Sequence, residues 1–222
     1  MLKRVCVVGI SFLFVVGCLA GEGSNDPLLG STEVAEDAAP VQEDAETAAT
    51  DGAEEAETNT CELPVDNLGV DPGNVLDLSA TFKNCDGEDV TLLDLVCGAE
   101  AVLIDIGAGW CEPCKEEAEH LEEDIVQVFK DQGVVVISIL TEDANSQPAT
   151  QAFCQGWTEE YGLTSPVITD PKNSAKTWIK GDPTTSLPIN IILNRDFVIE
   201  NYLVGGQSSA DLQAKINDVL ED

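Results

Sequence analysis

The residues of this 222-residue chain with the clearest chemical potential are two cysteines, Cys111 and Cys114, in the stretch Gly-Ala-Gly-Trp-Cys-Glu-Pro-Cys-Lys (107–115). A pair with this spacing can bind zinc, form a structural bridge or exchange electrons with other thiols. Zinc requires further ligands, and the one histidine, His120, lies among acidic residues at helical spacing, which favours a solvent-exposed ion pair. We therefore expect no metal at these cysteines.

The cysteines lie where a buried strand gives way to a helix. Residues 101–106 form a short, mostly apolar run, typical of a strand that is buried on both faces. The segment 111–133 then has apolar residues at helical spacing and ends at a glycine. Cys111 is expected at the helix N-terminus, where the dipole and the free N–H groups stabilise a thiolate. Pro113 is tolerated in the first turn.

The rest of the folded part alternates strands with helices and ends in a hairpin and a helix. Further strands are predicted at 134–140, 165–170, 189–193 and 198–204, and further helices at 148–162, 172–180 and 208–220. This order predicts an α/β fold with a central mixed sheet. Residues 61–222 suit one domain with its own core.

The N-terminus carries the features of an export signal. A short basic start precedes about a dozen apolar residues, whereas a membrane-spanning helix needs roughly twenty. The run ends in Val-Val-Gly-Cys, which resembles the lipobox of bacterial lipoproteins. This resemblance implies a signal peptide at 1–17 and an acylated Cys18. The alternative is ordinary cleavage within 18–23 without lipid. We expect a lipoprotein of the cell envelope that faces the periplasm or the exterior.

Residues 18–60 are predicted to be a disordered acidic tether. From position 19 onward this segment contains twelve acids and no lysine, arginine or aromatic residue, so it buries too little apolar surface to fold. The whole chain has a formal net charge of −32, which argues against binding to nucleic acid.

The active-site stretch, Val-Leu-Ile-Asp-Ile-Gly-Ala-Gly-Trp-Cys-Glu-Pro-Cys-Lys (102–115), resembles that of thioredoxin. The export signal, and the extra helix and short strand between 134–140 and the hairpin, make the chain similar to membrane-anchored thiol–disulfide oxidoreductases of the TlpA/ResA type, over about 77–220. The resemblance implies a three-layer thioredoxin-like fold with an inserted strand–helix element. It also implies an enzyme without a cofactor that reduces disulfides of partner proteins and takes electrons from a membrane donor.

The same resemblance assigns roles to single residues. Cys111 would be the attacking thiol and Cys114 the resolving thiol of a redox-active disulfide, with Trp110 as their aromatic flank. Asp105 would be the buried acid that handles the Cys114 proton, and Pro188 a cis-proline facing the disulfide. Asp105 could instead be a solvated residue at a strand end, and Trp110 a packing residue.

Four further cysteines lie in the folded part, and an exported domain usually pairs such a set. Three pairings are possible. The turn at 86–87 makes Cys85 and Cys97 local neighbours, so Cys85–Cys97 is the first choice and Cys61–Cys154 follows from it.

Two other functions remain open. One is an acidic surface lipoprotein of thioredoxin fold whose cysteines are structural only. The other is a peroxiredoxin-like antioxidant, which resembles the chain less well because Gly-Ala-Gly-Trp precedes Cys111 where a threonine is required. For an oxidoreductase we expect a reducing couple, since Glu112 opposes the stabilisation of the thiolate by Lys115 and the helix N-terminus.

Overall fold

The structure is a computed structural model that describes residues 61–181 and 186–221. These residues belong to the second of two compact units of the chain, Glu55–Asp222. The predicted signal peptide (1–17), the acylated Cys18 and the tether (18–60) lie outside the described residues. Within the described ranges no helix is long and apolar enough to cross a membrane.

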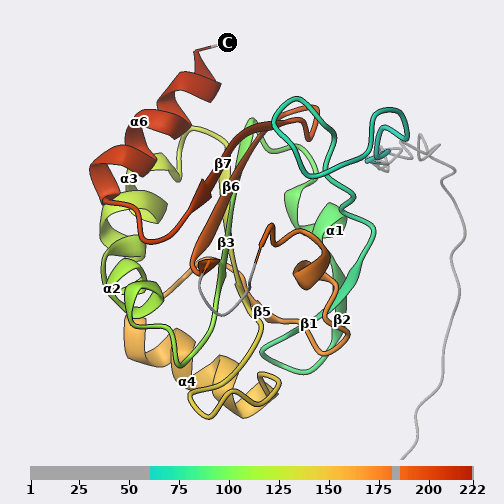
Figure 1. Ribbon diagram of the computed structural model, residues 1–222. Helices are drawn as coiled ribbons and strands as arrows, with labels where there is room; N and C mark the ends of the chain where they lie inside the picture. The colour runs from blue at the N-terminus through green and yellow to red at the C-terminus, as the bar shows by residue number, and fades with distance from the viewer. Residues whose placement is uncertain (1–60, 182–185, 222) are drawn as a thin grey trace, which may run out of the picture. The chain divides into compact units, whose positions relative to one another are not determined.

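A seven-stranded mixed sheet forms the centre of the domain (Figure 1). Its strands are β1 (Thr81–Asn84), β2 (Asp89–Thr91), β3 (Ala101–Gly107), β4 (Val134–Leu140), β5 (Val167–Thr169), β6 (Ile189–Asn194) and β7 (Ile199–Val204). They lie in the order β2-β1-β5-β4-β3-β6-β7. Strand β3 runs parallel to β4 and antiparallel to β6, and β4 runs parallel to β5. All seven residues of β3 are buried, which explains its mostly apolar pattern.

Helices cover both faces of this sheet. They are α1 (Leu92–Val96), α2 (Glu112–His120), the π-helix η1 (Leu121–Val126), α3 (Gln127–Phe129), α4 (Gln151–Tyr161), the 3-10 helix η2 (Ala175–Thr177) and α6 (Ser209–Leu220). Side chains of α2, η1, α3, α4 and α6 share one buried cluster, whereas α1 and η2 pack into a second cluster on the opposite face. Figure 1 shows these two layers on either side of the sheet. The predicted three-layer thioredoxin-like architecture is confirmed.

The helix that carries the cysteines follows the predicted apolar stripe. Segments α2, η1 and α3 continue one another from Glu112 to Phe129, and Leu121, Ile125 and Phe129 are almost completely buried. The last helix, α6, begins as its sequence predicts, because the Ser208 hydroxyl caps it by accepting the N–H of Asp211 at 3.1 Å.

The predicted helix at 172–180 is wrong apart from one 3-10 turn. The carboxylate of Asp170 accepts the N–H groups of Ser174 and Ala175, each at 2.8 Å, and Asn173 has a positive φ of 57°. These contacts hold the chain in a turn and leave only η2 as helix. The sequence analysis assigned no element to the region that forms β1, β2 and α1.

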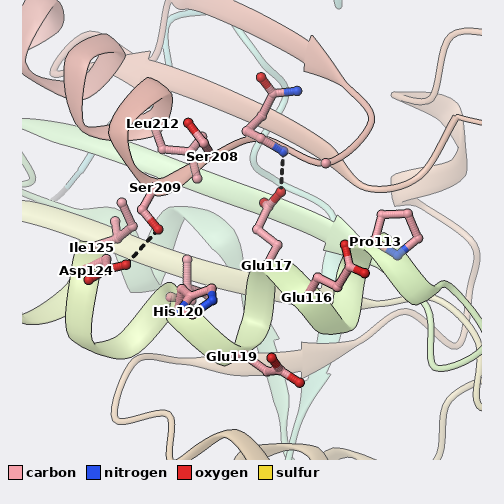
Figure 2. Close-up of a pocket in the computed structure, with 13 residues that line it drawn as sticks. Pro113, Glu116, Glu117, Glu119, His120, Asp124, Ile125, Ser208, Ser209 and Leu212 are labelled. Atoms are coloured by element: carbon pink, nitrogen blue, oxygen red, sulfur yellow. Dashed lines mark hydrogen bonds between the residues drawn. The ribbon is translucent and has the colours of Figure 1, made fainter.

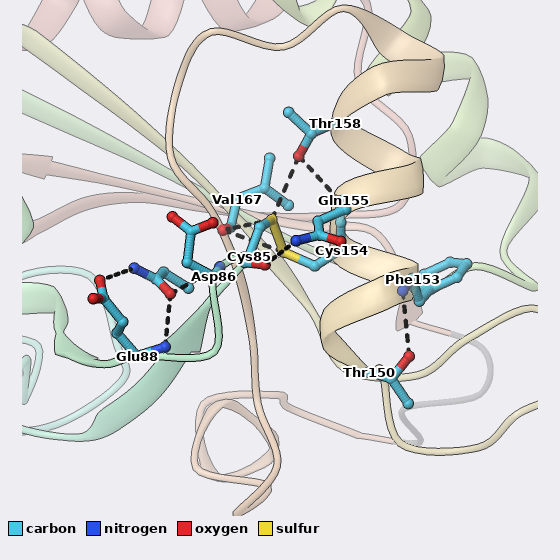
Figure 3. The surroundings of a disulfide bond; sticks show 10 residues. Cys85, Asp86, Glu88, Thr150, Phe153, Cys154, Gln155, Thr158 and Val167 are labelled. Atoms are coloured by element: carbon cyan, nitrogen blue, oxygen red, sulfur yellow. Dashed lines mark hydrogen bonds between the residues drawn. A yellow bond between two sulfur atoms is a disulfide. The ribbon is translucent and has the colours of Figure 1, made fainter. Parts of the chain in front are cut away.

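Both predicted structural disulfides, Cys85–Cys97 and Cys61–Cys154, are also wrong. The structure joins Cys85 to Cys154, with their Cα atoms 5.2 Å apart (Figure 3). The cause is a sheet contact between distant segments. Strand β1, which ends just before Cys85, pairs with β5, and the two sulfurs each lie 3.4 Å from the carbonyl oxygen of Val167. This register places Cys85 against α4 and away from Cys97.

Candidate active site

The two cysteines of the motif are bonded to each other at the start of α2. Cys111 is the N-cap residue, and its sulfur accepts the N–H of Cys114 at 3.3 Å. The S–S bond is 2.06 Å long, and both side chains are nearly inaccessible to solvent. Lys115, in the same helical turn, is bound to Glu112 at 3.1 Å. The positive charge nearest to the pair along the chain is therefore already neutralised.

Asp105 is a buried carboxyl in the middle of β3. It lies between Ser138 of β4 and Asn190 of β6 in the register of the sheet. The Ser138 hydroxyl donates to Asp105 Oδ2 at 3.5 Å, whereas Oδ1 is buried and has no hydrogen-bond partner. Burial raises the pKa of Asp105 well above its ordinary value, and the nearby charge of Glu117 raises it further. The alternative of a solvated residue at a strand end is wrong.

Asp105 lies on the side of β3 that faces α2. Side chains alternate along a strand, and Leu103 packs in the same buried cluster as Ala118 of α2. Gly107, two residues after Asp105 on this side, is so close to Cys114 that an added Cβ would lie 3.3 Å from the Cys114 Cβ. The side chain of Asp105 therefore lies on the same side of β3 as the close approach between Gly107 and Cys114.

Glu117 is a second buried carboxyl, which the sequence analysis missed. Its side chain is 7% exposed. Its Oε1 accepts the side-chain amide of Asn190 at 2.6 Å, and its Oε2 accepts the N–H of Gln207 at 2.9 Å. Burial raises the pKa of Glu117, although these two hydrogen bonds act in the opposite direction. Its spacing in the sequence could have revealed its burial, because position 117 follows Cys114 by three residues and precedes the buried Leu121 by four, which places all three on one face of the helix.

A cavity of about 770 Å³ opens beside these groups. Glu117 reaches from α2 to its hydrogen bond with the backbone N–H of Gln207. Figure 2 shows Glu117 in the lining of the cavity, with Pro113 at one end. The acidic side chains of Glu116 and Asp124 also line it. Glu117 therefore connects the buried centre of the sheet with a hollow in the protein surface.

Trp110, directly before Cys111, is held by a loop that follows β4. Its indole N–H donates to Glu142 Oε2 at 2.8 Å, and Lys176 binds the other carboxylate oxygen at 3.1 Å. The backbone carbonyl of Glu142 also accepts the N–H of Gly109 at 2.8 Å. A Cβ at position 109 would lie 2.4 Å from the ring of Phe153, so only glycine fits this close approach.

Pro188 precedes β6, and the Leu187–Pro188 peptide bond is cis. Its carbonyl accepts the N–H of Gly205 at 2.8 Å, which fixes the start of β6 against the end of β7. Leu187 and Ile189, its neighbours, are buried in the same cluster as Cys111 and Cys114. The structure thus places the five predicted site residues within β3, at and just before the start of α2, and just before β6.

No group of three or more metal-binding side chains occurs among residues 61–181 and 186–221. His120, on α2, is exposed.

Comparisons with known proteins agree with this geometry. A family model described as the AhpC/TSA family matches residues 74–201. The thiol-disulfide oxidoreductase ResA of Oceanobacillus iheyensis is 27% identical over 142 residues, which cover 64% of this chain and 68% of that protein. The thioredoxin-like protein YneN of Bacillus subtilis is 28% identical over 138 residues, which cover 62% of this chain and 74% of that protein.

Solved structures support the fold. A secreted thiol-disulfide isomerase from Corynebacterium glutamicum superposes with a TM-score of 0.55 at 18% identity, over 67% of this chain and 86% of that one. A thiol:disulfide interchange protein of the thioredoxin family from Chlorobium tepidum gives a TM-score of 0.51 at 18% identity, over 68% of this chain and 99% of that one.

Proposed function

Because the chain belongs to the AhpC/TSA family, and its relatives include thiol–disulfide oxidoreductases, we propose that it reduces disulfide bonds of other exported proteins through Cys111 and Cys114. One observation carries the proposal. A cysteine pair at a helix N-terminus lies over a strand that holds a buried carboxyl of raised pKa, Asp105. A structural bridge needs neither a thiolate-stabilising helix end nor a proton acceptor.

The reaction starts from the reduced pair. The Cys111 thiolate attacks one sulfur of the substrate disulfide, forms a mixed disulfide and releases the other substrate sulfur as a thiolate. The Cys114 thiol then loses its proton and attacks Cys111, which restores the Cys111–Cys114 bond and releases the second substrate thiolate. Asp105 accepts the Cys114 proton, since a carboxylate of raised pKa is an efficient base near neutral pH.

The charges around the pair support the reducing direction. The helix N-terminus stabilises the thiolate, but Lys115 is bound to Glu112, and two buried carboxyls, Asp105 on β3 and Glu117 on α2, add negative charge to this region when they are ionised. A weakly stabilised thiolate gives a couple that donates electrons. The oxidised pair then needs a reductant, and we propose a membrane electron donor for this step.

We also propose that the protein acts outside the cytoplasm, anchored through a lipid on Cys18. The support is the sequence alone, the Val-Val-Gly-Cys stretch after the apolar run. Two or more acyl chains give lasting attachment where one gives marginal binding. A Cys18→Ser protein should leave the membrane fraction after a salt wash. A variant that stays membrane-bound would disprove the anchor.

A peroxiredoxin-like antioxidant is the second candidate, and the match to the AhpC/TSA family model favours it. The residues before Cys111 speak against it, because Gly-Ala-Gly-Trp offers no threonine hydroxyl to a peroxide. Measured side by side, the consumption of hydrogen peroxide and the reduction of insulin by dithiothreitol distinguish the two candidates.

The test of the main proposal uses two single variants. Cys111→Ser should abolish the acceleration of insulin reduction, and Cys114→Ser should accumulate mixed disulfides with partner proteins, which appear as reducible adducts on non-reducing gels. If wild-type protein does not accelerate insulin reduction and Cys114→Ser forms no adduct, the cysteines are structural and the proposal is wrong.

A further inference from the structure

Asn190 of β6 is a fully buried polar side chain to which the proposed reaction gives no part. It lies directly opposite Asp105 in the antiparallel pairing of β3 with β6, and such opposed residues have their Cβ atoms about 5 Å apart. Ile192, two residues after Asn190, packs in the same buried cluster as Leu103, two residues before Asp105. Asn190 and Asp105 therefore share the face of the sheet that α2 covers.

The side-chain amide of Asn190 has one favourable orientation while Glu117 is ionised. Its Nδ2 donates to Glu117 Oε1 at 2.6 Å, and a carboxylate oxygen accepts only from a donor such as this N–H group. The opposite orientation would bring two acceptor oxygens together at this distance. The carbonyl end of the amide, Oδ1, is therefore turned away from Glu117.

Two buried oxygens on this face lack a donor. Asn190 Oδ1 and Asp105 Oδ1 are both inaccessible to solvent and have no hydrogen-bond partner among the described residues. Unpaired buried acceptors are costly, and neither oxygen can donate as long as Asp105 is a carboxylate. One proton on Asp105 removes both deficits, because Asp105 Oδ1 then becomes a donor and Asn190 Oδ1 its acceptor.

We propose that Asn190 is a positioning residue that keeps a proton on Asp105 and the negative charge on Glu117 in the oxidised protein. Its amide donates to the Glu117 carboxylate, and its carbonyl accepts the O–H of Asp105. Burial raises the pKa of both carboxyls. The N–H of Gln207 and the amide of Asn190 oppose this effect at Glu117, and the charge that Glu117 keeps raises the pKa of Asp105 further.

The role of Asn190 in the reaction rests on the proposed function. In the resolving step the proton of the Cys114 thiol passes to Asp105 while the Cys114 sulfur attacks Cys111 and the substrate thiolate leaves. The closed disulfide of the structure is the product of this step, and Asn190 has the orientation that accepts the O–H of the newly protonated Asp105. Asn190 itself gains and loses no proton. The proton returns to Cys114 when a reductant opens the bond.

Carbon-13 NMR of the carboxyl groups tests this placement in the oxidised full-length protein, without any substrate. The protein is labelled at the side-chain carboxyl carbons of aspartate and glutamate and titrated with acid and base, and Asp105→Asn and Glu117→Gln assign the two signals. In the wild type we expect Asp105 to keep its proton to a higher pH than Glu117. In Asn190→Leu, which nearly conserves volume, the Asp105 transition should move to lower pH and the Glu117 transition to higher pH.

Ser138→Ala is the matched control, because the Ser138 hydroxyl donates to the other oxygen of Asp105, Oδ2, at 3.5 Å. Loss of this donor should move the Asp105 transition to higher pH and leave that of Glu117 in place. A general loosening of the site would instead move Asp105 in the same direction in both variants. All proteins keep the charged side chains that line the neighbouring cavity, which are Glu116, Glu119, His120 and Asp124.

The wild-type titration decides the proposal even if Asn190→Leu does not fold. If Glu117 keeps its proton to the higher pH in the wild type, or if Asn190→Leu moves both transitions in one direction or neither of them, the proposal is wrong. The pH dependence of mixed-disulfide resolution then tests the role in the reaction, and its inflection should move to lower pH in Asn190→Leu. A wild-type protein that does not reduce insulin would overturn the proposed function, and the NMR titration would still decide where the proton lies.

Discussion

Removal of the Cys85–Cys154 bond should strongly destabilise the domain. The bond joins residues 69 positions apart, so it closes a long loop in the unfolded chain. Loop-closure entropy for this separation gives about 4 kcal/mol of stabilisation at 25 °C. The double variant Cys85→Ala, Cys154→Ala should therefore lose about 4 kcal/mol of unfolding free energy. It also removes side-chain atoms at Cys154, which is fully buried, so the measured loss should not fall below this figure by much.

Urea denaturation followed by tryptophan fluorescence measures this loss. Both proteins should carry Cys111→Ala and Cys114→Ala, so that the active-site bond does not contribute. The parent protein in dithiothreitol is the matched control, because it should unfold with nearly the free energy of the variant. A loss of less than about 1 kcal/mol would refute the loop-closure reasoning, and a parent protein that is unaffected by dithiothreitol would refute the pairing itself.

Two further predictions concern side chains around Cys111 and Cys114. Because the pKa of Asp105 is raised in the folded state, the unfolded chain releases this proton first, and wild-type stability should fall as the pH rises above about 4. Asp105→Asn should lack this loss, so in urea titrations its free energy of unfolding should rise relative to that of wild type as the pH rises. Its mixed disulfides should also resolve more slowly. A difference in unfolding free energy that stays constant across pH would contradict the raised pKa of Asp105. Glu142→Ala should remove the hydrogen bond between the Trp110 indole and a charged group, which is worth about 1.5–3 kcal/mol. The freed indole should show a shifted N–H resonance, and kcat/KM for insulin reduction should fall. Lys176→Ala, which breaks only the half-exposed ion pair, should leave the indole resonance in place; equal effects of the two variants would show that Glu142 does not position Trp110.

Local patterns in the sequence were sufficient for most of the fold. The mostly apolar run of β3 follows from burial of that strand, and the helical stripe through Leu121 and Ile125 follows from burial of one helix face. A single sequence displays such burial directly. The turn at 172–180 was missed because a single carboxylate, Asp170, decides it. Its hydrogen bonds to Ser174 and Ala175 override a helical pattern that carries no stop signal of its own.

The disulfides were missed because they depend on contacts between distant segments. Cys85 is close to Cys97 in sequence, but the pairing of β1 with β5 carries it to α4, and no local pattern encodes that pairing. The fold class was predicted correctly from the alternation of strands and helices, and the family from the active-site stretch together with the export signal and the extra helix and strand. The catalytic roles of Cys111 and Cys114 stay predictions, although the structure joins their sulfurs.

Glu117 marks the limit of reading the site from the sequence. It stands in a run of acidic residues on α2 that suggests a solvated face, and only its spacing from Cys114 places it on the buried side. Its effect on the pKa of Asp105 depends on the pairing of β3 with β6, which the sequence alone does not show. Asn190 lies opposite Asp105 in the sheet and donates its side-chain amide to Glu117, which brings the two carboxyls near each other, and the charge of Glu117 raises the pKa of Asp105.

The redox potential of the Cys111–Cys114 couple is the most direct test of the central claim. It is obtained by equilibrating the protein with mixtures of reduced and oxidised dithiothreitol and counting the Cys111 thiols that react with a maleimide. Because Lys115 is bound to Glu112 and two buried carboxyls lie beside α2, the Cys111 thiolate is weakly stabilised. The account therefore predicts a potential of about −270 mV, as in thioredoxin. A value near the about −120 mV of the strongly oxidising DsbA class would contradict it and make the protein an oxidant.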